Sequence, residues 1–108
     1  MIIGGVDSDE NTYNDTQIVN LSNRNSTCNN IPDITIAISF ATGAMVDGHP
    51  IICGGRSEGY NMHCECYHNS KVDNSWTFLT NMSTKRAWSA SVPVNGKLLV
   101  LGGEDADY

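Results

Sequence analysis

Six consecutive residues, His63-Cys64-Glu65-Cys66-Tyr67-His68, bring together most of the side chains that could do chemistry in this chain. Alternate residues of a β-strand share one face, so Cys64, Cys66 and His68 would point the same way on a strand. With Cys53 from a neighbouring strand they would form a Cys3His set, which zinc accepts. Structural zinc sites, however, usually place their cysteines on a turn with wider spacing, so that both sulfurs converge. The Cys-x-Cys pattern therefore favours disulfides over zinc, and we assign no metal, cofactor or catalytic residue.

The cysteines number four in 108 residues, which is more than a reduced compartment usually requires. Two cysteines that lie two apart on a strand do not bring their Cβ atoms within the usual bridging distance of about 4.5 Å. We therefore expect Cys53–Cys64 first, with Cys28–Cys66 as the second bridge. Four cysteines allow three connectivities, and the sequence does not decide among them.

Asn-x-Ser/Thr sequons occur at Asn14, Asn20, Asn25 and Asn81. Chance alone gives roughly two, judged from the frequency of the acceptor residues. Together with the cysteines, this excess predicts a secreted or extracellular glycoprotein, with a cytoplasmic location as the alternative.

Charge and hydropathy exclude other classes of partner. The formal net charge of −6, with only six Lys and Arg, argues against nucleic acid and anionic membranes. No apolar run reaches 18 residues, so we predict no transmembrane helix, and Met1-Ile2-Ile3 has none of the features of a signal peptide. We expect the natural N-terminus to lie upstream.

Three similar stretches must position these side chains, and each runs from buried-strand residues into a glycine pair. They are Met1-Ile2-Ile3-Gly4-Gly5, Ile51-Ile52-Cys53-Gly54-Gly55 and Leu98-Leu99-Val100-Leu101-Gly102-Gly103. Their first glycines lie 50 and then 48 residues apart, a period typical of a propeller blade. The 48-residue shift also aligns Asp47-Gly48 with Asn95-Gly96, two strong hairpin signals. The pattern predicts an all-β fold of four-stranded antiparallel blades, about two repeats of a longer ring.

The repeat sets the expected boundaries. We expect residues 1–35 to be the end of one blade, 36–81 a complete blade, and 82–108 the first half of the next. The predicted elements are a loop over Val6–Asn14, a weak strand over Asp15–Leu21, and strands over Ile38–Val46, Pro50–Gly54, Met62–Asn69, Trp76–Leu79, Trp88–Val94 and Lys97–Leu101. The two-residue difference in period should fall in a loop between the first glycine pair and Cys28. Because propellers have four to eight blades, we expect a piece of a longer protein, cut within a blade at both ends.

With these features the chain resembles kelch-repeat proteins, and its cysteines make it similar to their extracellular variants. Besides the glycine pairs, the resemblance depends on Tyr67, nine residues before Trp76, and on Arg86, ten residues after it. It implies four-stranded blades in a ring-shaped propeller that binds protein ligands at the loops on the ends of the ring. The first repeat departs from the pattern, with Val19, Cys28 and Ile38 at the positions of Tyr67, Trp76 and Arg86.

The repeat register also divides structural residues from candidate binding residues. Phe40, Trp76 and Trp88 are expected in the core between blades, and Arg86 in a hydrogen-bond network between them. Tyr60 and Met62, beside the loop after the second strand, are the better candidates for a ligand surface.

The leading hypothesis is a non-enzymatic protein-binding scaffold, whose partners are an unidentified protein ligand and further kelch blades. An intracellular kelch adaptor that recruits substrates to a ubiquitin ligase is the alternative. A copper-oxidase-type enzyme ranks third, because galactose-oxidase-type enzymes are also built on kelch blades, and His63, Tyr67, His68 and Tyr60 offer metal-binding side chains. The sequence contains neither a Gly-x-Ser-x-Gly motif nor a pattern that indicates a catalytic triad.

Overall fold

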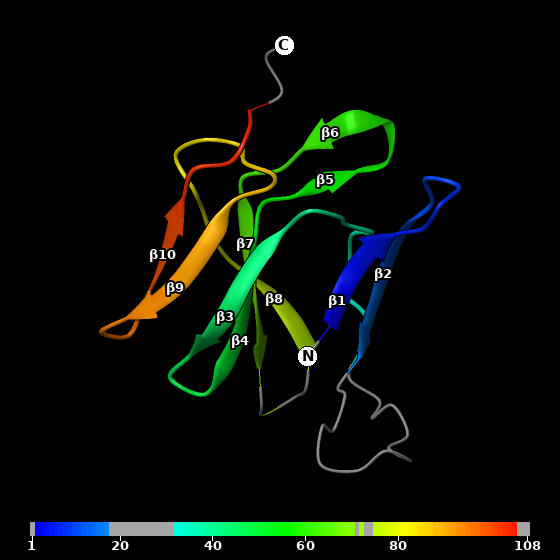
Figure 1. Cartoon of the computed structure of the whole chain (residues 1–108). Coiled ribbons are helices and arrows are strands. Elements are labelled where there is room, and N and C mark those ends of the chain that lie inside the picture. The colour runs from blue at the N-terminus through cyan, green and yellow to red at the C-terminus, as the bar shows by residue number, and fades with distance from the viewer. Residues whose placement is uncertain (1, 18–31, 71, 73–74, 106–108) are drawn as a thin grey trace, which may run out of the picture.

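The computed structural model describes residues 2–17, 32–70, 72 and 75–105. It is an all-β fold of antiparallel sheets with one short 3-10 turn, η1 (Glu58–Tyr60). Figure 1 shows a strand pair, a central sheet and a second strand pair side by side in chain order. Among the described residues, no helix is long and apolar enough to cross a membrane.

The central sheet has four strands in the order β3-β4-β7-β8, and each neighbour is antiparallel. They are β3 (Thr42–Val46), β4 (His49–Cys53), β7 (Glu65–Ser70) and β8 (Ser75–Asn81). Asp47 and Gly48 connect β3 to β4 with φ values of 49° and 76°, as a type I′ hairpin turn requires. The sheet confirms the prediction of an all-β fold with a four-stranded antiparallel sheet.

Three shorter pairs surround this sheet (Figure 1). The first joins β1 (Ile2–Val6) to β2 (Thr12–Gln17), and the last joins β9 (Ala90–Val94) to β10 (Lys97–Leu101). Between β4 and β7 the chain forms a small hairpin from β5 (Arg56–Ser57) through η1 to β6 (Asn61–Met62).

The 48-residue sequence shift is also a structural repeat. It moves the bounds of β3 and β4 onto those of β9 and β10. The same shift relates φ at Phe40 to φ at Trp88 (57° and 55°), and φ at Asp47 to φ at Asn95 (49° and 49°). Even the isolated bridge between Ser39 and Arg56 recurs 48 residues later, between Ala87 and Glu104.

Each joint between repeats uses a glycine pair. The Gly5 N–H donates to the Ile38 carbonyl (2.8 Å), and the Gly55 N–H donates to the Arg86 carbonyl (2.7 Å). Gly54 has φ +66°, and a Cβ there would overlap the same Arg86 carbonyl oxygen. Two independent features therefore require glycine at this position: the left-handed backbone, and the close approach of the next repeat.

Backbone hydrogen bonds locate the difference in period. The Ile34 N–H donates to the Asn14 carbonyl, and the Met82 N–H donates to the Cys64 carbonyl. The acceptors are 50 residues apart and the donors are 48 apart. The two-residue difference thus falls between Asn14 and Ile34.

The core lies between the β1–β2 pair and the central sheet. Its buried residues are Ile34, Ile38, Ile52 and Trp76. Tyr67 packs against this group, and the Trp76 indole N–H donates to the Pro32 carbonyl at 2.9 Å.

Several predicted boundaries were wrong. The strand expected over Met62–Asn69 is interrupted, because β6 ends at Met62 and β7 begins at Glu65. The strand expected from Trp88 begins only at Ala90, and the one expected from Asp15 begins already at Thr12. The expected loop over Val6–Asn14 is shorter, because β1 continues through its glycine pair to Val6 and β2 begins at Thr12. The strand expected from Ile38 begins only at Thr42, because Phe40 has a left-handed backbone that interrupts extended structure.

Candidate binding surface

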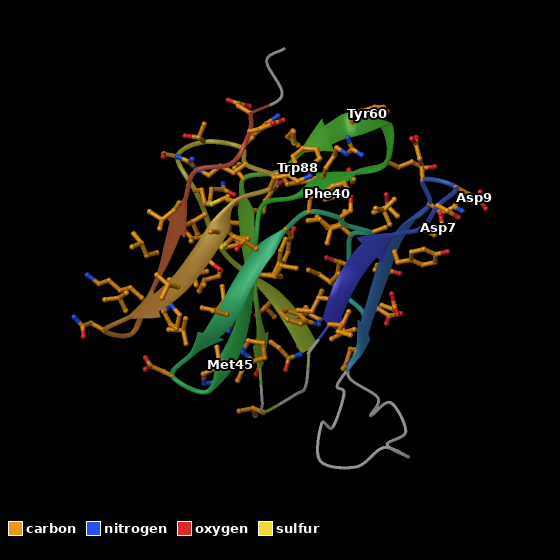
Figure 2. The ribbon with its side chains drawn as sticks, in the orientation of Figure 1. Asp7, Asp9, Phe40, Met45, Tyr60 and Trp88 are labelled. Carbon is orange, nitrogen blue, oxygen red and sulfur yellow. A yellow bond between two sulfur atoms is a disulfide. The ribbon has the colours of Figure 1, made fainter. Side chains whose placement is uncertain are left out.

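Two aromatic residues project from the same end of adjacent repeats. Phe40 and Trp88 each lie two residues before a strand, β3 and β9 respectively. The Trp88 N–H donates to the Phe40 carbonyl (3.0 Å), so the two backbones are adjacent and the side chains emerge together. Their rings stack with centroids 4.5 Å apart and planes inclined by 23°. Figure 2 shows both near Tyr60, at the end of the ribbon that carries β5 and β6.

Arg56 completes this group, which we call the aromatic–arginine cluster: Phe40, Arg56, Tyr60 and Trp88. The Arg56 guanidinium carbon lies 4.4 Å from the Tyr60 ring centroid, 5.1 Å from that of Phe40 and 5.2 Å from that of Trp88. The Arg56 backbone is fixed by two 2.8 Å hydrogen bonds with Ser39. The cation is thus oriented by rings and by backbone together, and cation–π attraction holds it there.

The cluster is partly open to solvent. Trp88 is 44% exposed and Tyr60 is 66% exposed. Arg56 forms no ion pair with any carboxylate in the described part of the chain. Its guanidinium N–H groups therefore remain available to a carbonyl or carboxylate, and the ring faces to apolar groups.

A polar hollow of ≈ 260 Å³ adjoins the cluster, and Arg56 and Tyr60 line both features. It lies between the β1–β2 turn and η1, and Asp9, Glu10 and Glu58 also line it. The cluster and the hollow thus combine apolar rings, the Arg56 cation and the carboxylates of Asp9, Glu10 and Glu58.

The turn beside this hollow is organised by Asp7. Its carboxylate accepts hydrogen bonds from the backbone N–H groups of Asp9 and Asn11, from the Asn11 amide, and from the Tyr13 hydroxyl. The side-chain bonds from Asn11 and Tyr13 are the largest influences, and they lower the pKa of Asp7 from 3.8 to about 2. The same bond to Asp7 raises the pKa of the Tyr13 hydroxyl.

The side chains of Ser57, His63 and Glu65 lie in contact one after another, an arrangement that the sequence did not indicate. His63 Nε2 lies 2.8 Å from Ser57 Oγ, and His63 Nδ1 lies 3.4 Å from Glu65 Oε2. This is the order of groups in a serine hydrolase, so it bears directly on whether the chain is an enzyme. Burial, the largest influence, raises the pKa of Glu65, but backbone N–H groups and the adjacent His63 outweigh it and lower the pKa.

The preceding repeat offers a structural explanation for the contact between Ser57 and His63. Residues 50 positions earlier than Ser57 and His63 are Asp7 and Tyr13, which are also hydrogen-bonded to each other, at 2.7 Å. The same positions are therefore linked in both repeats by different chemistry. We interpret both contacts as braces of a hairpin.

The disulfide pairing differs from our first expectation. Cys53 bonds Cys66, and these residues lie directly opposite each other on β4 and β7. Cys64 is a free thiol, so Cys53–Cys64 and Cys28–Cys66 are both wrong. Cys28 itself lies outside the described residues.

The Cys53–Cys66 bond also removes two ligands from the zinc set considered above. Within the described ranges, no three His, Cys, Asp or Glu side chains gather as a metal site would need. The two histidines that could have been copper ligands form hydrogen bonds with different hydroxyl groups. His63 is hydrogen-bonded to Ser57, and His68 is hydrogen-bonded to Thr77 at 2.7 Å.

The structure places the other predicted residues in three different settings. Met62 is only 6% exposed, so its assignment to a ligand surface was wrong, whereas Tyr60 is available to a partner. Trp88 was expected in the core and is instead exposed, although its stacking on Phe40 does join two repeats. The Arg86 guanidinium donates to the Gly102 carbonyl at 2.7 Å, and the Arg86 backbone carbonyl accepts from the Gly55 N–H of the preceding repeat.

The sequons divide between described and undescribed parts of the chain. Asn14 on β2 and Asn81 at the end of β8 are exposed. Asn20 and Asn25 lie outside the described residues.

Comparison with known proteins gives a fold but no family. No family model matches the chain, and no curated protein matches it. Among solved structures, the chain is similar to that of YjhT, with a TM-score of 0.80 and 18% sequence identity. The match covers 97% of this chain but only 35% of YjhT. The chain therefore shares the fold of about a third of a longer protein.

Proposed function

We propose that this chain is a segment of a non-enzymatic kelch-type propeller that binds a protein ligand through the aromatic–arginine cluster. The observation that carries the proposal is the preorganised set of Phe40, Arg56, Tyr60 and Trp88, in which Tyr60 and Trp88 are exposed and Phe40 and Arg56 are half-buried. Tryptophan, tyrosine and arginine are the residues most enriched among the energetic hot spots of protein interfaces. Side chains that are already oriented lose less entropy on binding, which favours affinity.

The proposal extends to the rest of the protein and to its compartment. Further blades of the same type would continue the ring beyond the first and third repeats. The Cys53–Cys66 disulfide supports a secreted or extracellular location over the intracellular adaptor alternative. Glycosylation at the exposed Asn14 and Asn81 would agree with that location.

Site-specific photo-crosslinking tests the binding surface. A benzophenone amino acid replaces Tyr60 or Trp88, and in a matched control it replaces Phe78, which is 55% exposed on β8, away from the cluster. After irradiation in the fluid or extract of the source, the Tyr60 and Trp88 positions should yield one shared protein adduct that Phe78 does not. Adducts at Phe78 but at neither cluster position would contradict the proposal.

A further inference from the structure

The turn between β9 and β10 contains Asn95-Gly96, the only Asn-Gly dipeptide in the sequence. Both residues are exposed, and their φ values of 49° and 72° are those of a type I′ turn. The β9–β10 register begins with Val94 opposite Lys97, so Gly96 lies outside the ladder. In the part of the chain that the structure describes, no backbone carbonyl accepts a hydrogen bond from the Gly96 N–H. The turn therefore presents an asparagine side-chain amide beside a backbone nitrogen that no other backbone group holds.

An asparagine followed by glycine can react with the backbone of its own turn. The Gly96 nitrogen bonds to Cγ of Asn95, the Cγ–Nδ2 bond breaks, and ammonia leaves with the proton of the Gly96 nitrogen. The product is a five-membered succinimide, and glycine favours the step because it has no Cβ to crowd the attacking nitrogen. Water then opens the ring at either carbonyl. One opening gives aspartate, and the other gives the isoaspartyl isomer, in which the main chain runs through the side-chain carbon.

The preceding repeat shows that the aspartate product fits the fold. Asp47 and Gly48 hold the same positions in the β3–β4 turn, with φ values of 49° and 76°. Conversion of Asn95 to aspartate therefore reproduces a turn that already exists one repeat earlier. The isoaspartyl product instead adds one carbon to the main chain, which disturbs a turn whose geometry depends on two residues.

The β3–β4 and β9–β10 turns also lie against each other. Asp47 Oδ2 is 3.1 Å from the point where a Cβ on Gly96 would stand. β3 and β9 are joined near their first residues as well, because the Thr42 hydroxyl donates to the Ser91 hydroxyl at 2.7 Å. A carboxylate in place of the Asn95 amide would thus add a second negative charge beside Asp47, and neighbouring like charges repel.

We propose that Asn95 is a site of spontaneous deamidation, which converts the β9–β10 turn to the Asp-Gly form of the preceding repeat and adds a negative charge beside Asp47. The only co-reactant is water. The reaction is independent of the aromatic–arginine cluster, and it gives the protein a charge change that accumulates with time at the contact between two repeats.

Incubation of the intact chain in mildly alkaline buffer, followed by peptide mapping with mass spectrometry, tests the site. We expect a gain of one mass unit at Asn95, divided between aspartate and isoaspartate. Asn61 is an internal control, because it is also exposed but precedes Met62. Asn69 is a buried control, with 4% exposure. Neither control should change.

Two variants test the route through the succinimide. Gly96→Ala should slow the reaction at Asn95 at least about tenfold, because a Cβ then crowds the attacking nitrogen. Lys97→Gln is the matched control, since it changes the same turn but keeps the Asn-Gly dipeptide, and it should react at the rate of the unaltered chain.

A thermodynamic cycle tests the consequence of the reaction. Asn95→Asp should keep the fold and lower the melting temperature, and the loss should be smaller when Asp47→Asn is also present. Equal losses with and without Asp47→Asn would reject the repulsion between the two turns.

Three outcomes would overturn the assignment of the site: no mass gain at Asn95, an equal gain at Asn61, or an unchanged rate in Gly96→Ala. None of these results depends on crosslinking at Tyr60 or Trp88, so the deamidation site and the protein-binding surface are tested separately.

Discussion

At Phe40 and Trp88 the fold imposes an unfavourable backbone conformation on single residues. A bulky side chain at positive φ is uncommon and costs about 1–3 kcal/mol, so it persists only where its surroundings enforce it. Here it recurs at two positions 48 residues apart, where it directs both rings out of the strand plane and onto each other. Strain at these positions thus creates the exposed cluster.

Gly54 and Gly102 allow the cost of a repeat joint to be measured. They occupy equivalent positions with nearly equal φ, +66° and +65°, but only Gly54 approaches a neighbouring carbonyl, that of Arg86. Gly102→Ala should destabilise by about 1–2 kcal/mol, the cost of left-handed backbone for alanine. Gly54→Ala should cost about 3 kcal/mol or more, because overlap with Arg86 is added.

Chemical denaturation of the two variants measures both values. Equal losses for Gly54→Ala and Gly102→Ala would show that the close approach to Arg86 contributes nothing.

Asp7 predicts a local dependence on pH. Because its pKa falls from 3.8 to about 2 on folding, the ionised carboxylate stabilises the β1–β2 turn above about pH 4. That contribution should be lost as pH falls from about 4 toward 2, where the carboxylate becomes protonated. NMR titration of the Asn11 amide should report a midpoint near 2, and Asp7→Asn should abolish the transition. A midpoint near 3.8 would contradict these hydrogen bonds.

Sequence register identified which residues are equivalent but not where their side chains lie. Trp76 and Trp88 both fall in repeat register, yet only Trp76 is buried. The difference is the positive φ of Trp88, which has no signature in residue type. The exposed cluster could therefore be predicted only through Tyr60.

At the scale of elements, the small β5–β6 hairpin explains the disulfide. It occupies much of the connection between β4 and β7, so β7 begins at Glu65 and Cys64 lies outside the strand. Cys66 then falls opposite Cys53. The sequence predicted the neighbouring strands, but the register of β7 depended on a hairpin whose strands have only two residues each.

The disulfide predicts a clear contrast among cysteine variants. It closes a connection with a sequence separation of 13, for which the loss of chain entropy predicts about 3 kcal/mol of stabilisation. Cys53→Ala with Cys66→Ala should lose about this amount in denaturation, whereas Cys64→Ser should change little. Alkylation before reduction should modify Cys64 but neither Cys53 nor Cys66. Modification of Cys53 without reductant would contradict this pairing.

The brace between Ser57 and His63 predicts stability without catalysis. The chain should show no covalent labelling at Ser57 by a fluorophosphonate and no ester hydrolysis that Ser57→Ala removes. His63→Ala should instead speed amide exchange in the β5–β6 hairpin, as Tyr13→Phe should in the β1–β2 turn. Labelling at Ser57 that requires His63 would establish an enzyme.

Across the whole molecule, repeats are joined by backbone hydrogen bonds between a glycine pair and the next repeat. The repeat period and the glycine pairs predicted this architecture from sequence. The contacts themselves could not be predicted, because they depend on backbone positions that glycine permits but does not specify.

Amide hydrogen exchange in the intact chain, followed by NMR, tests this claim most directly. The N–H groups of Gly55, Met82 and Arg86 donate across the joint between the second and third repeats. They should exchange as slowly as those of β4, and much more slowly than those of the exposed Asn95-Gly96 turn. Exchange of Gly55, Met82 and Arg86 at the rate of that turn would mean that the repeats are not joined as described.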